Sequence, residues 1–325
     1  MKKVLKILLA TMLVAITAVA FVGCDNGANA GGEKGLLIKK IDGVYTIYDY
    51  VEVEGETTLD IGKVLEAKGL KDVEYIIKEG AFEGNTSLTK ITVSDKAIEI
   101  GSGAFKDMTA LQILEVPFVG KTAVADAFYK QTPETVGKSV DRERTMAHFF
   151  GNTIYDDGSK VTINYGAGDA ICFLPASFKQ IVINASADYS IPMYAFNGAS
   201  NLTNITINGA KAIGEGAFKG CVNVKEITIP ASVTTIYKNA FDGCTKLENV
   251  YVSSNVTIMD GAFNGCLKVK YFGEKIDNPV NFTIDLANVL SAGKNAFNFG
   301  KETYQVINNN NSIDLEGAFG ETKRA

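Results

Sequence analysis

The repeated unit of this chain begins with Gly216-Ala217-Phe218-Lys219-Gly220-Cys221. It returns as Asn239-Ala240-Phe241-Asp242-Gly243-Cys244 and again as Gly261-Ala262-Phe263-Asn264-Gly265-Cys266, so the phenylalanines follow one another at intervals of 23 and 22 residues. A short apolar segment follows each copy. A fixed period of about 20–29 residues with one short strand per unit is typical of a solenoid, in which each coil packs only on its neighbours.

Nine Ala-Phe pairs share this register along the chain. Their phenylalanines are Phe82, Phe105, Phe128, Phe196, Phe218, Phe241, Phe263, Phe297 and Phe319. We expect these rings, above all Phe82, Phe105, Phe196, Phe218, Phe241 and Phe263, to fill the interior between coils. The residue before each pair is mostly Gly or Asn, which predicts a left-handed backbone position at this turn. Tyr194 is the exception, and we expect an altered turn there.

The segment after each turn alternates between apolar and polar residues. In Leu202-Thr203-Asn204-Ile205-Thr206-Ile207 the alternation points Ile205 and Ile207 inward and Asn204 and Thr206 outward. We expect equivalent strands to start near Leu88, Leu111, Phe178, Val224, Leu247 and Leu267. Stacked strands form a parallel sheet, so the predicted fold is a β-rich α/β leucine-rich-repeat solenoid with a parallel sheet on one face, an N-terminal cap and an irregular central island.

These units resemble the BspA-like leucine-rich repeats of bacterial surface proteins, with the pattern Gly-Ala-Phe-x-Gly-Cys-x-x-Leu-x-x-Ile-x-Ile-Pro. The resemblance covers roughly residues 70–320 and is most specific over 191–270. The pattern departs at 273–295, which is stretched, and at the last unit, where no strand follows Phe319. The resemblance implies an exported surface protein of a kind often linked to adhesion or to binding of host proteins.

The N-terminus resembles a bacterial lipoprotein signal. Lys2, Lys3 and Lys6 precede an apolar run from Ile7 to Val22, which is shorter than the ~20 residues that usually span a membrane. Cys24 then follows Val22-Gly23, as does the diacylated cysteine of a lipobox. Two acyl chains on Cys24 would anchor the chain stably, and an ordinary cleaved signal with an incidental cysteine is the alternative.

The remaining chain is organised around the repeats. We expect a signal at 1–23, a flexible tether at 24–35, an N-terminal cap at 36–79, the solenoid at 80–319 and a tail at 320–325. Within the cap, Val44–Val53 reads as a strand and Ile61–Gly69 as a short helix. The island at about 120–190 is either a set of long binding loops or a decayed run of three repeats that fills space.

Composition and motifs argue against several function classes. Removal of residues 1–23 takes away three lysines and no acid, so the net charge moves from −5 to −8, which disfavours nucleic acid as a partner. No nucleophile motif accompanies the single histidine, His148, and we expect it to have a surface or packing role. Asp156-Asp157-Gly158-Ser159 lacks the spaced ligands of a calcium loop and is predicted to be a turn.

The cysteines of the repeat share one column. Cys221, Cys244 and Cys266 are spaced too far apart for a structural zinc motif, and neighbouring coils offer poor disulfide geometry. A metal-binding or oxidisable thiol ladder is the alternative. We expect these three, and Cys172 in the island, to be buried free thiols that pack as small hydrophobes.

The outward strand positions form the other candidate surface. One row holds Lys90, Ile113, Gln180, Asn204, Glu226, Asn249 and Tyr271, and a second holds Thr92, Glu115, Val182, Thr206, Thr228 and Tyr251. The candidate binding residues are Asn204, Thr206, Glu226, Thr228, Asn249, Tyr251 and Tyr271, with the two tyrosines as an aromatic pole. A sheet face that is merely solvated is the alternative.

The sequence therefore predicts a membrane-anchored, non-catalytic binding or adhesion module that needs no cofactor and no metal. We expect a protein or glycan partner, no nucleic acid, and a monomer exposed at the bacterial cell surface. A structural envelope protein without a discrete ligand is the competing class. A hydrolase hidden in the island ranks last, because no metal cluster, nucleophile elbow or phosphate loop is present in the sequence.

Overall fold

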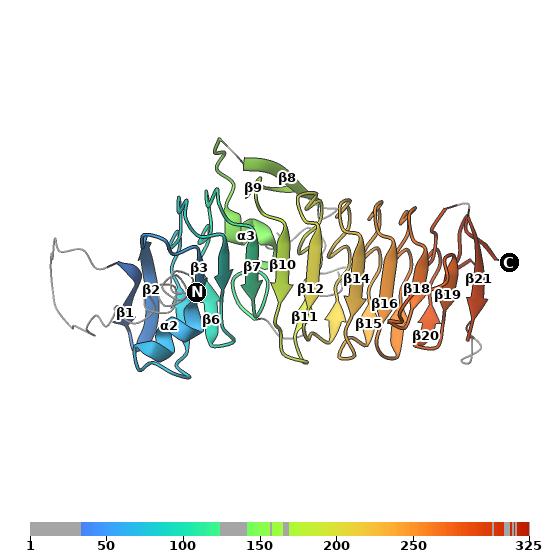
Figure 1. Ribbon diagram of the computed structural model, residues 1–325, viewed down its shortest axis with the longest axis horizontal. Coiled ribbons are helices and arrows are strands. Elements are labelled where there is room, and N and C mark those ends of the chain that lie inside the picture. Colours follow the sequence, from blue (N-terminus) through green and yellow to red (C-terminus); the bar gives the residue numbers. More distant parts are fainter. Residues whose placement is uncertain are drawn as a thin grey trace, which may run out of the picture.

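The computed structural model describes residues 34–123, 142–156, 158–164, 169–300, 302–308, 313, 315 and 317–324. This part of the chain forms an elongated stack of coils in which strands from successive coils lie side by side (Figure 1). The solenoid architecture predicted from the repeat is confirmed. Cys24, the tether up to residue 33 and the Ala127-Phe128 pair lie outside the described residues.

The stack begins with a hairpin and a short helix. β1 (Gly35–Ile41) pairs antiparallel with β2 (Val44–Val51), so that β2 lies where the sequence predicts a strand. The helix α2 (Ile61–Ala67) also lies where it was predicted, and the side chain of Asp60 caps it by accepting a hydrogen bond from the backbone N–H of Lys63 at 3.1 Å. The hairpin covers the first coil, because β2 continues into parallel pairing with β4 (Tyr75–Ile77).

Two parallel sheets, which we call the principal sheets, contain the strands that follow the Ala-Phe turns in the regular coils, together with the equivalent strands of the irregular coils. The first contains β3 (Thr58–Asp60), β5 (Lys90–Thr92), β7 (Ile113–Val116), β10 (Gln180–Ile183) and β12 (Asn204–Ile207). The second contains β14 (Glu226–Ile229), β16 (Asn249–Val252), β18 (Tyr271–Gly273), β19 (Thr283–Asp285), β21 (Thr303–Ile307) and β22 (Lys323–Arg324). The predicted strands are confirmed, but the buried residue before β18 is Val269, and Leu267 is exposed. The expectation that no strand follows Phe319 is wrong, because β22 pairs with β21 in the last coil.

A second strand in most coils builds two further sheets, the secondary sheets. One contains β1, β2, β4 and β6 (Ala97–Ile100). The other contains β11 (Ser190–Ile191), β13 (Ala212–Ile213), β15 (Thr235–Ile236), β17 (Val256–Ile258) and β20 (Val289–Ala292). Apart from β1 and β2 of the hairpin, these strands have two to four residues, which is too short to show an alternating pattern, and the prediction of one strand per unit therefore missed them.

The repeat phenylalanines stack in one column inside the solenoid. The ring centroids of Phe196 and Phe218, Phe218 and Phe241, and Phe241 and Phe263 are 5.4, 5.3 and 5.0 Å apart, with interplanar angles of 2°, 17° and 0°. Phe82 and Phe105 stack in the same way at 5.6 Å. Since these rings are fully buried, each contributes about 1.5–3 kcal/mol through burial alone. The predicted aromatic interior is confirmed.

The residue before each described Ala-Phe pair has a positive φ, as the glycines and asparagines predict. Tyr194 also has a φ of 56°, so the expectation of an altered turn at this position is wrong. The neighbouring coil accommodates the bulky residue: a Cβ on Gly216 would lie 2.6 Å from Cε1 of Tyr194. The tyrosine hydroxyl also donates to Oε1 of Glu215 at 3.3 Å. The turn is therefore kept regular by a missing side chain one coil away.

The described part of the island builds one enlarged coil. β7 pairs directly with β10 and β10 with β12, so the alternative in which the island is a decayed run of three repeats is wrong. The helix α3 (Met146–Phe150) takes the place of the Ala-Phe turn, with the Phe149 ring 5.8 Å from that of Phe105. The hairpin of β8 (Gly158–Asn164) and β9 (Asp169–Pro175) then stands out beside the stack (Figure 1).

The principal sheet divides between β12 and β14, which share no backbone pairing. In the flanking coils the residue after the strand donates to the coil before it: Asn208 N to Ile183 O at 2.8 Å and Ser253 N to Ile229 O at 3.1 Å. The equivalent residue after β14 is Pro230, which has no N–H to donate. The paired β13 and β15 and the stacked rings of Phe196 and Phe218 hold these two coils together instead.

The stretched segment predicted at 273–295 adds one strand, β19, to the principal sheet and none to the secondary sheet. Residues 274–282 connect β18 directly to β19, its neighbour in the principal sheet, without a further Ala-Phe turn. On the other side β17 pairs directly with β20. The Phe272 ring lies between those of Phe263 and Phe297, at 5.5 and 5.1 Å, and continues the aromatic column across this irregularity.

We expect Phe241→Ala to lower the free energy of unfolding by about 3–5 kcal/mol, because the substitution leaves a cavity and removes the stacking contacts with both Phe218 and Phe263. Urea denaturation followed by circular dichroism measures this. Phe282→Ala is the matched control: the residue is 40 % exposed and its ring packs in a T-shaped contact with Tyr304, so its loss should cost less than about 1.5 kcal/mol. Equal losses in the two variants would contradict a stability that depends on the column.

Candidate binding face

The outward side chains of the principal sheets form the two rows that the sequence predicts. Glu226 pairs in register with Asn249, and Asn249 with Tyr271, while Thr228 pairs with Tyr251. In the first sheet Gln180 pairs with Asn204 in the same way, and Val182 with Thr206. Because parallel strands hold equivalent residues side by side, the rows run across each sheet, and on the second sheet the row that contains Tyr251 is interrupted at Gly273. We call this surface the principal face.

The exposure of the principal face changes along the solenoid. Asn204, Glu226 and Thr228 are exposed, whereas Thr206 and Asn249 are half-buried. Tyr251 and Tyr271 are only 8 % and 2 % exposed, so the expected protruding aromatic pole is wrong. The cause is the segment 274–282, which the repeat pattern does not contain. A binding role for the seven residues stays a prediction.

The covering segment contacts both tyrosines. The ammonium group of Lys275 lies 5.4 Å from the centre of the Tyr251 ring, and the hydroxyl of Tyr271 donates to the backbone oxygen of Glu274 at 3.0 Å. The two tyrosine rings are 6.2 Å apart. Burial raises the pKa of both hydroxyls, with Glu226 adding to the effect at Tyr251 and Asp285 at Tyr271. Both tyrosines are therefore neutral at physiological pH.

Lys275 and Asp285 also belong to this surface, although the repeat pattern does not predict them. The sequence signal that could have indicated an irregularity here is Gly273, because it lies beside Tyr251 in the outward row, where a side chain is expected. A Cβ on Gly273 would lie 2.9 Å from the Tyr271 hydroxyl and 2.5 Å from Cβ of Asp285. The Tyr271 ring thus fills the place of the missing side chain and reaches the next strand.

Charges on the second principal sheet differ between the two ends of its strands. At the amino ends, Nζ of Lys270 lies 2.7 Å from Oε2 of Glu248, and this hydrogen bond, with further attraction from Lys225 and Lys268, lowers the pKa of the Glu248 carboxyl. Glu226, the first residue of β14, is a second carboxylate at these ends, against the three lysines. At the carboxyl ends, Asp285 follows the tyrosine pair, with Glu274 beside it. The face is thus more basic at the amino ends and more acidic at the carboxyl ends.

The cysteine column lies inside the solenoid. Each thiol donates to the backbone oxygen of the phenylalanine one coil earlier: Cys221 to Phe196 at 3.4 Å, Cys244 to Phe218 at 3.2 Å and Cys266 to Phe241 at 3.1 Å. These three and Cys172 are buried and form no disulfide, which confirms the prediction of buried free thiols and contradicts an oxidised ladder. Burial, together with the adjacent Cys244, raises the pKa of the Cys221 and Cys266 thiols.

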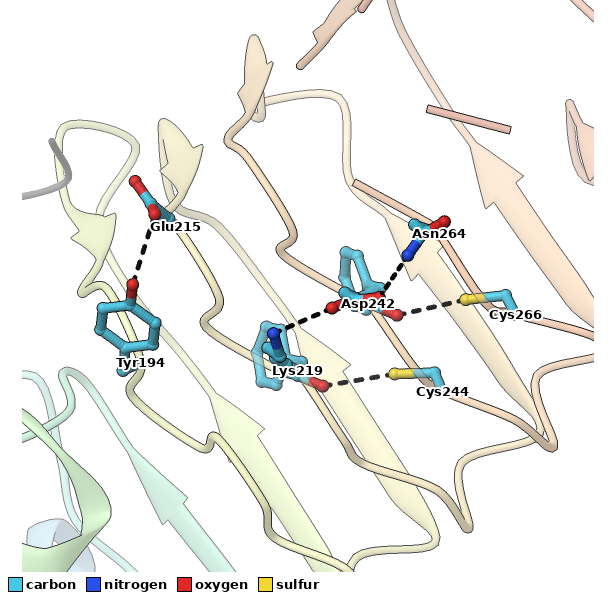
Figure 2. A network of polar contacts seen from close by, with 9 residues as sticks. Tyr194, Glu215, Lys219, Asp242, Cys244, Asn264 and Cys266 are labelled. Carbon is cyan, nitrogen blue, oxygen red and sulfur yellow. Dashed lines mark hydrogen bonds and ion pairs between the residues drawn. The ribbon is translucent and has the colours of Figure 1, made fainter. Parts of the chain in front are cut away.

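A polar ladder runs outside the aromatic column, at the residue after each phenylalanine (Figure 2). Nζ of Lys219 lies 3.0 Å from Oδ2 of Asp242, and the Asn264 amide donates to Oδ1 of Asp242 at 2.9 Å. Asn298 continues the ladder by donating to Asn264 Oδ1 at 2.7 Å. Each contact joins one coil to the next, so we assign this ladder to coil stacking and not to ligand binding.

The remaining candidates of the island lie in or near the core. His148 is buried, and its Nε2 lies 2.7 Å from the backbone oxygen of Ile100, which confirms a packing role. The rings of Phe149 and Phe150 are fully buried as well. Of the turn predicted at 156–159, Asp156 lies in a turn, Asp157 lies outside the described residues, and Gly158 and Ser159 already belong to β8, so the prediction is wrong for these two residues.

Two general features complete the described part of the chain. No three His, Cys, Asp or Glu side chains gather there in an arrangement that would hold a metal ion. Neither α2 nor α3 is long and apolar enough to cross a bilayer, and no other helix in the described ranges is either.

The repeat identifies the family. The model of the BspA type leucine-rich repeat region matches residues 70–139 and 169–281 in six copies, which is more than half of the chain. The chain belongs to this family. The matched ranges include the regular coils on both sides of the island, where the Ala-Phe turn and the principal strand are present, while the cysteine column is confined to the coils after the island.

Several solved structures are similar to this BspA-type chain. A leucine-rich repeat protein of T. pallidum is 17 % identical, covering 81 % of this chain and 86 % of its own, with a TM-score of 0.36. One from Eubacterium ventriosum is 20 % identical over 86 % and 91 % of the two chains, with a TM-score of 0.34. A leucine-rich cell surface protein of Faecalibacterium prausnitzii is 14 % identical over 78 % and 96 %, with a TM-score of 0.28. No curated protein matches the sequence.

We expect the four cysteines that remain in a Cys24→Ser variant to react with a thiol reagent such as DTNB only after unfolding, even at pH 9. Burial raises the pKa of the Cys221 and Cys266 thiols and keeps them protonated above the ordinary thiol value of about 8.5, and all four thiols are shielded from the reagent by burial. Thiolate then forms in the unfolded state first, so this contribution to stability should fall as the pH rises past that value.

An exposed thiol introduced by Thr245→Cys provides the control, and it should react at once under the same conditions. Reaction of the four native thiols at a similar rate would contradict a closed column.

Proposed function

We propose that this protein is an exported, lipid-anchored surface protein whose principal face binds a protein or glycan partner without catalysing a reaction. The observation that carries the proposal is the pair of straight rows on the second principal sheet, with Glu226 and Thr228 exposed at its first strand. Extended faces of this kind are what solenoid proteins use to bind other molecules. Membership of the BspA-type family, which includes bacterial surface proteins, supports the same reading.

The burial pattern supports the principal face over the island as the binding surface. The island residues Phe149 and Phe150 are committed to the core, and His148 is hydrogen-bonded beneath the surface. Exposed polar side chains on adjacent strands can instead be changed without opening the core, because the inward residues Ile227 and Ile229 carry the packing. Variants on this face therefore separate binding from folding.

The anchor is proposed from the sequence, because Cys24 lies outside the described residues. A diacylated Cys24 followed by a glycine-rich tether would hold the solenoid at the membrane while leaving its face free to meet a partner. The mildly acidic composition also fits a protein or glycan better than nucleic acid.

For the anchor, we expect Cys24→Ser to abolish incorporation of a palmitate analogue in a bacterial host and to move the protein out of the membrane fraction. A thioether bond to Cys24 is the attachment that this substitution removes. Cys172→Ala, which removes a buried thiol of the island, should leave labelling unchanged. Labelled Cys24→Ser protein would contradict a lipid anchor at this residue.

For the binding face, the full chain in mild detergent is screened against purified surface glycoproteins and glycans, and the best-retained ligand is titrated. We expect the double variant Glu226→Ala/Thr228→Ala to weaken binding at least about 5-fold, as for residues within an interface centre. The matched control is Glu99→Ala/Thr234→Ala, which makes the same two changes on the side of the secondary sheets. Equal effects, or no retained ligand at all, would instead favour a structural envelope protein.

A further inference from the structure

The carboxyl ends of β16, β18 and β19 carry an aromatic site that part of the same chain covers. Tyr251 points outward from β16. The residue beside it on β18 is Gly273, which has no side chain, and the Tyr271 ring lies over Gly273 and extends toward Asp285. The two rings, 6.2 Å apart, form a continuous aromatic surface across three strands. Gly273 has a φ of 154° and would clash with Asp285 if it carried a side chain, so the backbone is shaped to let the ring lie there.

The segment 274–282 covers this site, and the side chain of Lys275 contacts the Tyr251 ring. Lys275 places its ammonium 5.4 Å from the centre of the Tyr251 ring, within the range of a cation–π contact. Residues 274–278 are exposed, so the ammonium group reaches the ring from the solvent side and not from the core. Such a contact is weak at an exposed position, and a competing cation can therefore replace it.

The segment is held in place loosely. Asn278 and Phe282 have φ values of 55° and 59°, and a left-handed conformation is strained for a residue as large as phenylalanine. Ile276, Val280 and Phe282 are 48, 68 and 40 % exposed, so their side chains add little burial that would fix the segment. At its start, the segment contacts the face through Lys275 and through the bond from the Tyr271 hydroxyl to the Glu274 backbone. At its end, Phe282 is fixed by backbone hydrogen bonds with Lys270 and Gln305 and by its ring against Tyr304, so the loosely held part is residues 274–280.

Carboxylates surround the two tyrosine hydroxyls. Glu226 acts on Tyr251, and Asp285 and Glu274 act on Tyr271. The described hydrogen bonds to Asp285, from Ala287 N and Asn308 Nδ2 at 3.0 Å each, both use Oδ1, which leaves Oδ2 available. The lysines of this sheet gather instead at the amino ends around Glu248. An aromatic ring with carboxylates beside it is complementary to a cation.

We infer that the Tyr251–Tyr271 site receives a lysine or arginine side chain from a basic segment of a partner protein, and that Lys275 occupies this position until the partner displaces it. This inference rests on the proposed function and names the partner chemistry of the same face. The net charge of −5, or −8 after removal of residues 1–23, favours approach of such a basic segment. The partner's cation replaces the Lys275 ammonium above the Tyr251 ring, and the carboxylates of Glu226 and Asp285 attract it.

The test measures binding of a fluorescent octalysine peptide to the full chain in mild detergent, at low and at physiological salt. Lys275→Met removes the ammonium group that covers Tyr251 but keeps most of the aliphatic side chain. The affinity of this variant for octalysine should be about 2–5-fold higher than that of the matched control. That control, Lys268→Met, removes the same charge from an exposed position at the amino ends of the strands and leaves the ring covered. Asp285→Asn, which retains an acceptor for Ala287 and Asn308, should weaken binding about 2–5-fold, whereas Asp95→Asn at an exposed loop should not.

Equal affinities of the Lys275→Met and Lys268→Met proteins would overturn the inference, and so would an unchanged affinity of Asp285→Asn. Failure of octalysine to bind any of the proteins would overturn it as well, as would displacement of a bound ligand by neutral maltoheptaose and not by octalysine. Loss of this inference leaves the proposed function standing if a ligand is still retained and still depends on Glu226 and Thr228. Loss of the proposed function shows instead as the absence of any retained ligand.

Discussion

The whole molecule depends on keeping successive coils at one spacing, and the column of phenylalanine rings enforces it from within. Backbone pairing places adjacent strands at about 4.8 Å. The stacked rings of Phe196, Phe218, Phe241 and Phe263 repeat at 5.0–5.4 Å, close enough to that spacing for one ring to serve each coil. The small residue beside each ring admits this approach, and the cysteine thiols hydrogen-bond across the same interval. Ring, thiol and backbone thus impose a single repeat distance.

This constraint explains how the irregular parts are tolerated. Where the Ala-Phe turn is replaced, Phe149 takes up the contact with Phe105, and where an extra strand is inserted, Phe272 stands between Phe263 and Phe297. Pro230 removes a donor between β12 and β14, but the stacked rings and the secondary strands still join the two coils. Departures from the repeat are therefore allowed on the surface as long as an aromatic ring continues the column.

The same departures shape the candidate binding face. A regular coil between β18 and β19 would have carried the chain away from the principal sheets and back through another turn. The direct connection at 274–282 instead keeps it over the outward rows, where Lys275 meets Tyr251. An insertion that leaves the core unaltered has thereby changed which side chains of the face a partner can reach. Surface chemistry in this protein is set by the irregular segments, and stability by the regular ones.

The sequence by itself determined the solenoid, the parallel principal strands, the left-handed turns and the buried thiols, because each depends on a pattern repeated within one coil of 22 or 23 residues. It also placed the two outward rows correctly, since side chains alternate along every strand. Only the tertiary structure decided that Tyr194 keeps a regular turn, that the island supplies one coil, and that Tyr251 and Tyr271 are covered. Each of these depends on a residue one coil or more away, such as Gly216, Phe149 or Lys275, and a local pattern contains no information on which segments fold against it.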